Sequence, residues 1–152
     1  ELVLYCVDRW IHADRVIRPA LWRGMVVLSD RYYDSTMAYQ GAGRKLPASF
    51  VRRWVLGVGD LPKPDLTVLL DCTVETGFHR LRDRGRAPDR MEREAHSFHR
   101  RIRAAYLGRA RKEPNRIRVI DSSRLLPNVL RDVRVAVASI LDPVAARRVS
   151  GR

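Results

Sequence analysis

The sequence has no long apolar run, few cysteines and no histidine pattern suited to a metal. None of its hydrophobic stretches reaches the ~18 residues of a membrane-spanning helix, and its start lacks the basic-then-apolar pattern of a secretory signal. Cys6 and Cys72 lie far apart in the sequence, so we expect both to be reduced core residues. The nearest histidines, His96 and His99, have no carboxylate partner suited to zinc. These absences predict a soluble, cytoplasmic protein and argue against zinc or redox chemistry.

Acidic residues are scarce relative to basic ones. The chain has 17 aspartates and glutamates against 30 lysines and arginines, which gives a formal net charge of +13 at pH 7. Such an excess is typical of proteins that bind nucleic acid, an acidic membrane surface or phosphorylated small substrates. Aromatic residues do not alternate with a basic stripe as they do in a nucleic-acid stacking platform. The positions of particular arginines therefore matter more than the total charge.

The hydrophobic pattern predicts an α/β protein. Short continuous apolar runs are typical of strands buried on both faces of a parallel sheet, and they occur at 25–29, 66–71 and 117–121. Helical periodicity covers Glu1 to about Arg23, 46–58, 74–84, 90–112 and 127–141. The alternation predicts one domain over 1–152, with a parallel sheet and crossover helices. Within the first helix we expect a kink at Pro19 and a stop at Gly24.

Polar residues follow each predicted strand directly. Asp30 and Arg31 come after the first strand, Asp71 ends the second, and Asp121 ends the third. Ligands of open α/β sheets bind beyond the carboxyl ends of the strands, so this edge is the expected site. An acid there can hold a metal ion or its water, and an arginine can grip a phosphate with two hydrogen bonds. Taken alone, Asp30 and Arg31 fit a structural salt bridge equally well.

Longer stretches resemble one enzyme family. "DRYYDSTMAYQG" (30–41) resembles the Asp-Arg-Tyr or Asp-Arg-His signature of thymidylate kinases, and the whole of 1–43 is similar to one block of that family. "PDLTVLLD", "RLRDRGRAPDRME" and "IRVIDSS" follow in the family's order and spacing, so the resemblance covers about 1–123. It implies a P-loop NTPase-type nucleoside monophosphate kinase fold. It also implies transfer of the γ-phosphoryl group of MgATP to thymidine monophosphate (dTMP), by a homodimer that pairs through the first helix.

The resemblance assigns the residues after the first strand to the transferred phosphoryl group. Arg31 matches the arginine that holds the monophosphate, and Asp30 matches the acid beside the reacting group. We expect Asp30 to organise Mg²⁺ through water, because a monophosphate oxygen is already anionic near pH 7 and needs no strong base. Ser35 and Thr36 match residues that offer hydroxyls to the nucleotide.

Four further residues match the family's nucleoside pocket. Tyr5 corresponds to the aromatic that stacks on thymine, where the family usually has Phe, and Arg9 to the arginine that hydrogen-bonds a pyrimidine carbonyl. They are four residues apart on one predicted helix, so they share a face. Tyr39 would lie against the sugar and disfavour a ribose 2′-hydroxyl, and Gln40 would address the base.

The ATP side of the expected site rests on an arginine-rich segment at about 82–92, which corresponds to the family's lid. Arginines delivered by a closing loop stabilise the charge that develops during phosphoryl transfer. Asp89 and Glu92 would position this loop. The adenine ring would lie at Ser123 and Arg124, in the turn after the last strand. The lid arginines expected to contact the phosphates are Arg84, Arg86 and Arg90.

One part of such a kinase is missing from the sequence. The motif G-x-x-x-x-G-K-[ST], whose amides and lysine cradle ATP phosphates, does not occur, and none of Lys45, Lys63 and Lys112 fits it. The family carries this loop upstream of the helix with which the sequence begins. We therefore expect a truncated chain that lacks the first strands of its sheet. Such a chain should be marginally stable, aggregation-prone and inactive by itself, because its remaining strands would have unpaired edges.

Two alternatives remain open at this point. The first is a related nucleoside monophosphate kinase with a different base preference, for which Tyr5 leaves room although Arg9 and Gln40 favour a pyrimidine. The second is a non-catalytic remnant that binds nucleotides or nucleic acid through its positive charge. Polyanion binding would weaken steeply with salt and show no base preference, whereas a thymine pocket would distinguish dTMP from uridine monophosphate.

Overall fold

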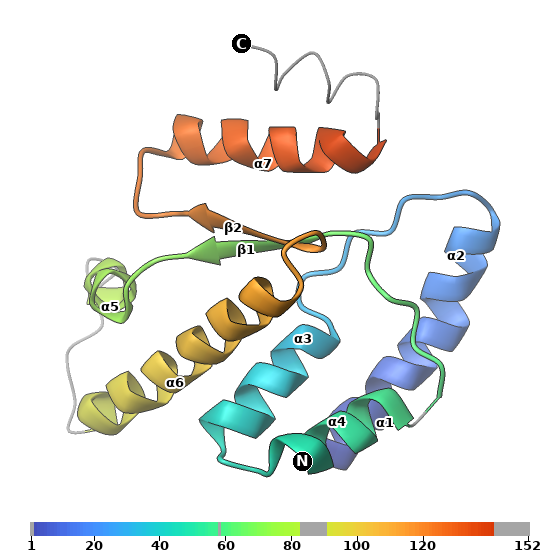
Figure 1. The fold of residues 1–152 in the computed structure, drawn as a ribbon, viewed down its shortest axis with the longest axis horizontal. Coiled ribbons are helices and arrows are strands. Elements are labelled where there is room, and N and C mark those ends of the chain that lie inside the picture. The colour runs from blue at the N-terminus through green and yellow to red at the C-terminus, as the bar shows by residue number, and fades with distance from the viewer. Residues whose placement is uncertain (1, 58, 83–90, 142–152) are drawn as a thin grey trace. The chain divides into compact units, whose positions relative to one another are not determined.

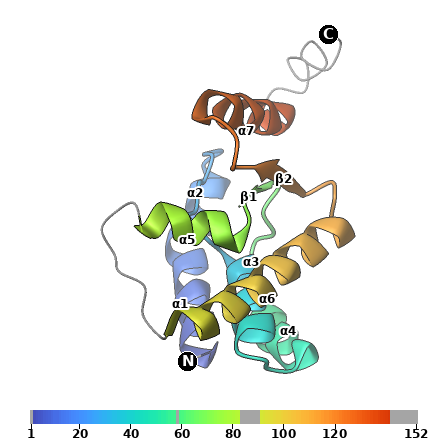
Figure 2. The same ribbon diagram turned by 90° about the vertical axis from the view of Figure 1, so that its left-hand side faces the viewer.

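The computed structural model describes residues 2–57, 59–82 and 91–141. The chain divides into two compact units, residues 1–63 and 64–152, and each unit is described by itself. The organisation of 1–152 as one kinase domain stays a prediction. Within the described residues, no helix is long and apolar enough to cross a membrane. Figures 1 and 2 show the elements of both units.

The first unit opens with the predicted helix, in three consecutive pieces. These are α1 (Leu2–His12), the π-helical segment η1 (Ala13–Ile17) and α2 (Arg18–Trp22). Pro19 lies in the first turn of α2, where its missing N–H is tolerated, and the wider π-helical turn comes just before it. The predicted irregularity is therefore a π-helical segment in front of the proline.

Gly24 ends this helix, as predicted. Its φ of +72° is left-handed, a conformation that glycine adopts without steric cost. The amide of Gly24 donates to the carbonyl of Leu21 at 2.9 Å, and the amide of Met25 donates to that of Ala20 at 3.0 Å. This pair of bonds is a Schellman motif, which satisfies carbonyls at the helix end and turns the chain away.

The prediction of a strand at 25–29 is wrong for this structure. The segment is irregular, and Met25, Val26 and Leu28 are 54%, 71% and 97% exposed. A strand exists only beside a hydrogen-bonded neighbour, and no neighbouring strand lies next to this segment among the described residues. The apolar run is real, but nothing in this part of the chain buries it.

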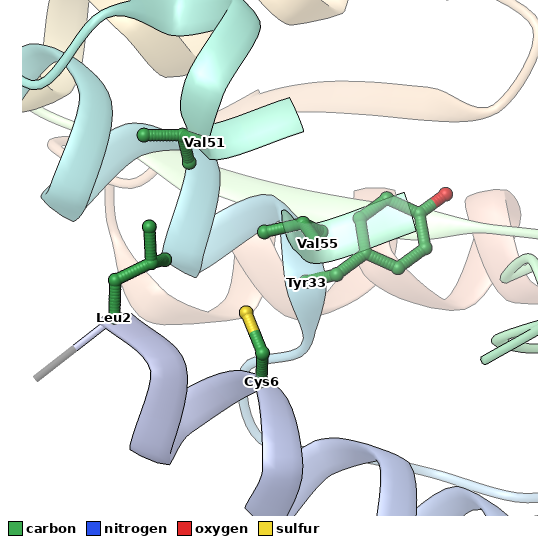
Figure 3. Close-up of a cluster of buried hydrophobic side chains, with 5 residues drawn as sticks. All are labelled: Leu2, Cys6, Tyr33, Val51 and Val55. Carbon is green, nitrogen blue, oxygen red and sulfur yellow. The ribbon is translucent and has the colours of Figure 1, made fainter. Parts of the chain in front are cut away.

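The rest of the first unit is helical. The short helix α3 (Tyr33–Thr36) continues into the π-helical segment η2 (Met37–Gly43), and α4 (Ala48–Gly57) confirms the helix predicted at 46–58. The core of this unit lies where α1, α3 and α4 meet, and Figure 3 shows Leu2 and Cys6 of α1 pointing toward the valines of α4. Cys6 is buried there with a free thiol, as predicted. The buried cluster consists of Leu2, Cys6, Tyr33, Val51 and Val55.

The second unit contains a parallel two-stranded sheet. Strands β1 (Thr67–Asp71) and β2 (Ile117–Asp121) pair in register from Thr67 with Ile117 to Asp71 with Asp121. Helix α7 covers one face of the sheet and α6 lies toward the other (Figures 1 and 2). Both strands and the three helices confirm the predicted α/β pattern to within a few residues. The helices are α5 (Val74–Arg82), α6 (Met91–Lys112) and α7 (Leu126–Leu141).

Candidate functional site

The backbone at Arg31 is held in a rarely populated conformation. Its φ is +67°, which costs a residue with a Cβ about 1 kcal/mol relative to ordinary backbone. The hydroxyl of Ser29 donates to the carbonyl of Arg31 at 2.8 Å and bridges the bend. Asp30 and Arg31 are both exposed. The bend thus presents a carboxylate and a guanidinium next to each other and open to solvent.

The guanidinium of Arg31 lies over an aromatic ring. Its central carbon is 5.2 Å from the ring centroid of Tyr39, within the range of a cation–π contact. Tyr39 comes from η2, so the helical segment that follows the bend folds back to the arginine. The structure therefore brings together two of the predicted substrate residues, Arg31 and Tyr39.

A set of polar side chains in α3 and η2 is buried rather than open. The side-chain oxygen of Thr36 has no hydrogen-bond partner among the described residues, which is costly for a buried hydroxyl. Several buried polar side chains in one short segment are typical of a preorganised binding site or of an internal hydrogen-bond network. The sequence prediction missed Asp34, whose only signal was its place beside the predicted hydroxyls. The buried polar residues are Asp34, Ser35, Thr36 and Gln40.

The positive charge of Arg9 in α1 affects the pKa of Tyr32, the residue next to Arg31. Burial raises the pKa of the Tyr32 hydroxyl, the neighbouring Tyr33 raises it further, and the cations of Arg9 and Arg18 partly offset these effects. Arg9 likewise offsets the rise that burial causes in the pKa of the Cys6 thiol. The positive charge of the partly buried Arg9 therefore acts on groups of the first unit on both α1 and the approach to α3. Tyr5, four residues earlier on the same helix, is half exposed.

In the second unit, the carboxyl ends of the two strands meet as predicted. Asp71 lies opposite Asp121 in the ladder. The carboxylate of Asp71 accepts two bonds from Arg103 of α6, from Nε at 2.7 Å and from a terminal nitrogen at 2.8 Å. This contact raises the pKa of Arg103. Sequence reasoning missed Arg103, because nothing in the pattern of α6 distinguishes it from the other arginines.

Side chains of the turn after β2 hydrogen-bond within the turn and fix its shape. Oδ1 of Asp121 accepts bonds from the hydroxyl and the amide of Ser123, which are the main causes of a lowered pKa at Asp121. Arg124 pairs with Asp132 of α7, which raises the pKa of Arg124 and lowers that of Asp132. Ser123 and Arg124 are both exposed. The residues predicted to meet adenine thus form a preorganised turn.

A cavity of about 310 Å³ opens between the end of β1 and helices α5 and α6. Asp71, Cys72 and Arg103 line it, so Cys72 is only partly buried rather than a core residue. The ring of Phe78 stacks on His96 with centroids 4.0 Å apart and meets His99 edge-on at 5.5 Å. These two histidines therefore pack against an aromatic ring of α5.

The predicted lid falls largely outside the described residues. Arg84, Arg86, Asp89 and Arg90 belong to the segment that is not described, and the placement of the Glu92 side chain is not described either. Their assignment to the phosphates of ATP stays a prediction.

Comparison with known proteins gives consistent matches. Residues 1–133 match the family described as "Thymidylate kinase". The chain is 48% identical over 134 residues to a thymidylate kinase of Leifsonia xyli subsp. xyli, covering 88% of this chain and 63% of that protein. It is 43% identical to one of Clavibacter michiganensis subsp. michiganensis, covering 93% and 67%. It is 45% identical to one of Nitratidesulfovibrio vulgaris, covering 100% and 71%. The chain thus spans about two thirds of the length of these relatives.

Proposed function

The chain belongs to the thymidylate kinase family, and we propose that the protein phosphorylates dTMP to thymidine diphosphate with MgATP in the cytoplasm. The observation that carries this proposal is the family match over 1–133, which includes the exposed Asp30–Arg31 bend and its contact with Tyr39. The alternative of a binding remnant has no comparable support among the described contacts.

At the bend, Arg31 holds the phosphate of dTMP. Its planar guanidinium can donate two parallel bonds to phosphate oxygens, and its exposure leaves the donors accessible. Asp30 organises Mg²⁺ through water. One carboxylate is sufficient for that task, because Mg²⁺ in such sites keeps several waters and takes its other ligands from substrate phosphates. The exposed carboxylate next to the phosphate-binding arginine fits this role.

The nucleoside of dTMP binds across α1 and η2. Tyr5 stacks on the thymine, Arg9 and Gln40 address its edge, and Tyr39 lies against the deoxyribose. The position of Tyr39 below the Arg31 guanidinium supports this, because sugar and phosphate are adjacent in the substrate. Thr36 supplies a hydroxyl whose bonding capacity is not used by the described residues, and Ser35 adds a second hydroxyl.

ATP binds with its adenine at the turn of Ser123 and Arg124 and with its phosphates at the lid arginines Arg84, Arg86 and Arg90. The preorganised turn supports the first assignment, since a fixed turn can present backbone groups to a flat ring without an ordering cost. The second assignment rests on the family resemblance of the segment at 82–92.

The glycine-rich phosphate loop is not within these 152 residues, and we propose that the complete protein supplies it together with further strands of the sheet. The exposed run from Met25 to Leu28 supports this proposal, because an added strand beside it would bury its side chains and bond its backbone. The 152-residue chain alone is then inactive as a kinase.

A second copy of the protein covers the outer face of α1. Leu2 and Cys6 use one side of this helix for the core, while the rest of its surface carries exposed apolar residues. A contiguous apolar stripe is typical of an interaction surface. A homodimer formed through this face is the arrangement that we propose. The exposed residues of the stripe are Val3, Leu4, Val7, Trp10 and Ile11.

The test is a coupled assay of ATP-dependent phosphorylation of dTMP and of deoxyuridine monophosphate. It is run on this chain and on a form extended upstream to include a phosphate loop. We expect activity only in the extended form, with dTMP preferred. An extended form that binds dTMP but transfers no phosphoryl group would contradict the kinase assignment. Equal use of dTMP and deoxyuridine monophosphate would indicate a different base preference.

A further inference from the structure

Four residues of the second unit form a continuous chain of hydrogen bonds along the carboxyl edge of the sheet. Arg103 of α6 holds the Asp71 side chain at the end of β1 with bonds of 2.7 and 2.8 Å. Ser122, directly after β2, donates to the carbonyl of Asp71 from its amide at 2.7 Å and from its hydroxyl at 2.9 Å. Arg80 of α5 donates to the carbonyl of Ser122 at 2.9 Å.

The amide bond of Ser122 continues the parallel ladder past the pair of Asp71 and Asp121, as the register requires. The hydroxyl bond of Ser122 and the side-chain bonds of Arg103 and Arg80 are additional to that ladder. The turn that begins at Ser122 is thus fixed from three sides: by β1, by α5 through Arg80 and by α6 through Arg103 acting on Asp71. Charge-assisted bonds such as that of Arg103 with Asp71 are roughly twice as strong as neutral ones.

Resting on the function proposed above, we propose that Asp71, Arg103 and Arg80 are positioning residues for the adenine-binding turn. They touch no reacting group. They hold the backbone of Ser122 and its successors in the shape that recognises adenine, so that affinity for ATP and preference for ATP over GTP both depend on them. The site for dTMP lies in the other unit and does not depend on these bonds.

The experiment uses the form of the protein that is active in the dTMP assay and compares Arg80→Met and Arg103→Met with wild type. Each variant should raise the KM for ATP about three- to tenfold, the effect of losing one or two anchoring bonds. Preference for ATP over GTP should fall, while the KM for dTMP should stay within about twofold. Arg103→Lys, which keeps the charge but only one bond, should lie between wild type and Arg103→Met.

Arg100→Met is the matched control. Arg100 is an exposed arginine of α6 that pairs with Glu75 of α5 at 3.3 Å, away from the turn, so its loss removes the same charge without touching Ser122. It should leave the KM for ATP and the preference for ATP within about twofold of wild type. An equal rise in the KM for ATP would mean that charge rather than position is responsible, and the proposal would be wrong.

Other outcomes are equally decisive. If Arg103→Met does not fold, the test rests on Arg80→Met, because the Arg80 side chain is exposed and its loss should not disturb the core. Unchanged ATP affinity and selectivity in Arg80→Met would overturn the inference. If wild type neither phosphorylates dTMP nor binds ADP in a calorimetric titration, the proposed function is wrong and the inference falls with it. Wild-type ADP binding that Arg80→Met fully retains would refute the inference alone.

Discussion

At the scale of single residues, Arg31 shows a strained backbone at a place where chemistry is proposed. A left-handed φ in a residue with a Cβ persists only where the surroundings impose it, and such residues gather at ligand sites. Ser29 supplies part of that constraint through its bond to the carbonyl of Arg31. Stability and function therefore make opposite demands on this position.

Replacement of Arg31 by glycine should separate these demands. Glycine adopts a φ of +67° without steric cost, so Arg31→Gly should be about 0.5–1 kcal/mol more stable than Arg31→Ala, which loses the same contact with Tyr39. Arg31→Gly should also weaken dTMP binding at least about tenfold, because a charge-assisted bidentate contact is lost. Chemical denaturation and a dTMP titration measure the two effects. An Arg31→Gly variant no more stable than Arg31→Ala would show that the bend is not strained.

Gly59 makes a second residue-scale prediction. Its φ is +77°, and an added Cβ would lie 2.0 Å from Cδ1 of Trp10. Gly59→Ala should therefore destabilise the protein by about 2 kcal/mol, through backbone strain and displacement of the indole ring. Gly57→Ala is the control, because nothing lies within 4 Å of the added methyl group. It should change the unfolding free energy by less than about 0.5 kcal/mol, and equal effects of the two variants would refute the steric argument.

At the scale of elements, local pattern predicted most of the fold. The Schellman end at Gly24, the strands β1 and β2 and the helices α4 to α7 each follow from periodicity and from glycine and proline positions. Three segments differ. The run at 25–29 has strand composition, but a strand forms only with a partner. The π-helical turns of η1 and η2 depend on how the chain packs around them, which composition does not reveal.

The contact between α5 and α6 should be sensitive to pH. Burial lowers the pKa of His99, and the nearby His96 lowers it further. The other charged groups at this contact are Glu75, Arg100 and the ion pair of Asp71 with Arg103. Because the unfolded His99 binds a proton more readily than the folded one, acidification favours the unfolded state. Its contribution to stability should be complete above the ordinary value of about 6.5 and should fall as pH drops below it.

Thermal melting between pH 8 and pH 5 measures this effect. The melting temperature of wild type should fall over the acidic part of the range, and the fall should be smaller in His99→Gln. His12→Gln, a change at an exposed histidine of α1, serves as control and should follow the wild-type curve. An identical pH profile for His99→Gln and wild type would mean that His99 does not contribute.

At the scale of the whole molecule, the candidate site could be predicted only in part. Asp30, Arg31 and Tyr39 were proposed as site residues from one contiguous segment, and the structure brings Arg31 and Tyr39 into contact. Arg103 was not found, because its partner Asp71 lies 32 residues earlier and only the folded sheet edge joins them. Contacts of this range depend on topology, which no local pattern encodes.

The last prediction concerns the exposed apolar run at Met25–Leu28. Charged substitutions there should be beneficial in the 152-residue chain and harmful in the extended form. In the 152-residue chain, Val26 and Leu28 are open to water, so the double change Val26→Lys and Leu28→Lys should reduce aggregation without lowering the melting temperature. In the extended form, where we propose that an added strand buries this run, two buried lysines should abolish folding or activity. Light scattering and the coupled dTMP assay measure the two outcomes.

Leu125→Lys is the control for this pair of outcomes, because Leu125 is also apolar and 75% exposed but lies outside the run, in the turn before α7. It should be tolerated in both forms. If the double variant remains fully active in the extended form, no strand covers 25–29 and the proposed completion of the sheet is wrong. A wild-type chain of 152 residues that stays monomeric and melts cooperatively would contradict the same proposal from the other side, since an uncovered apolar run should then carry no penalty.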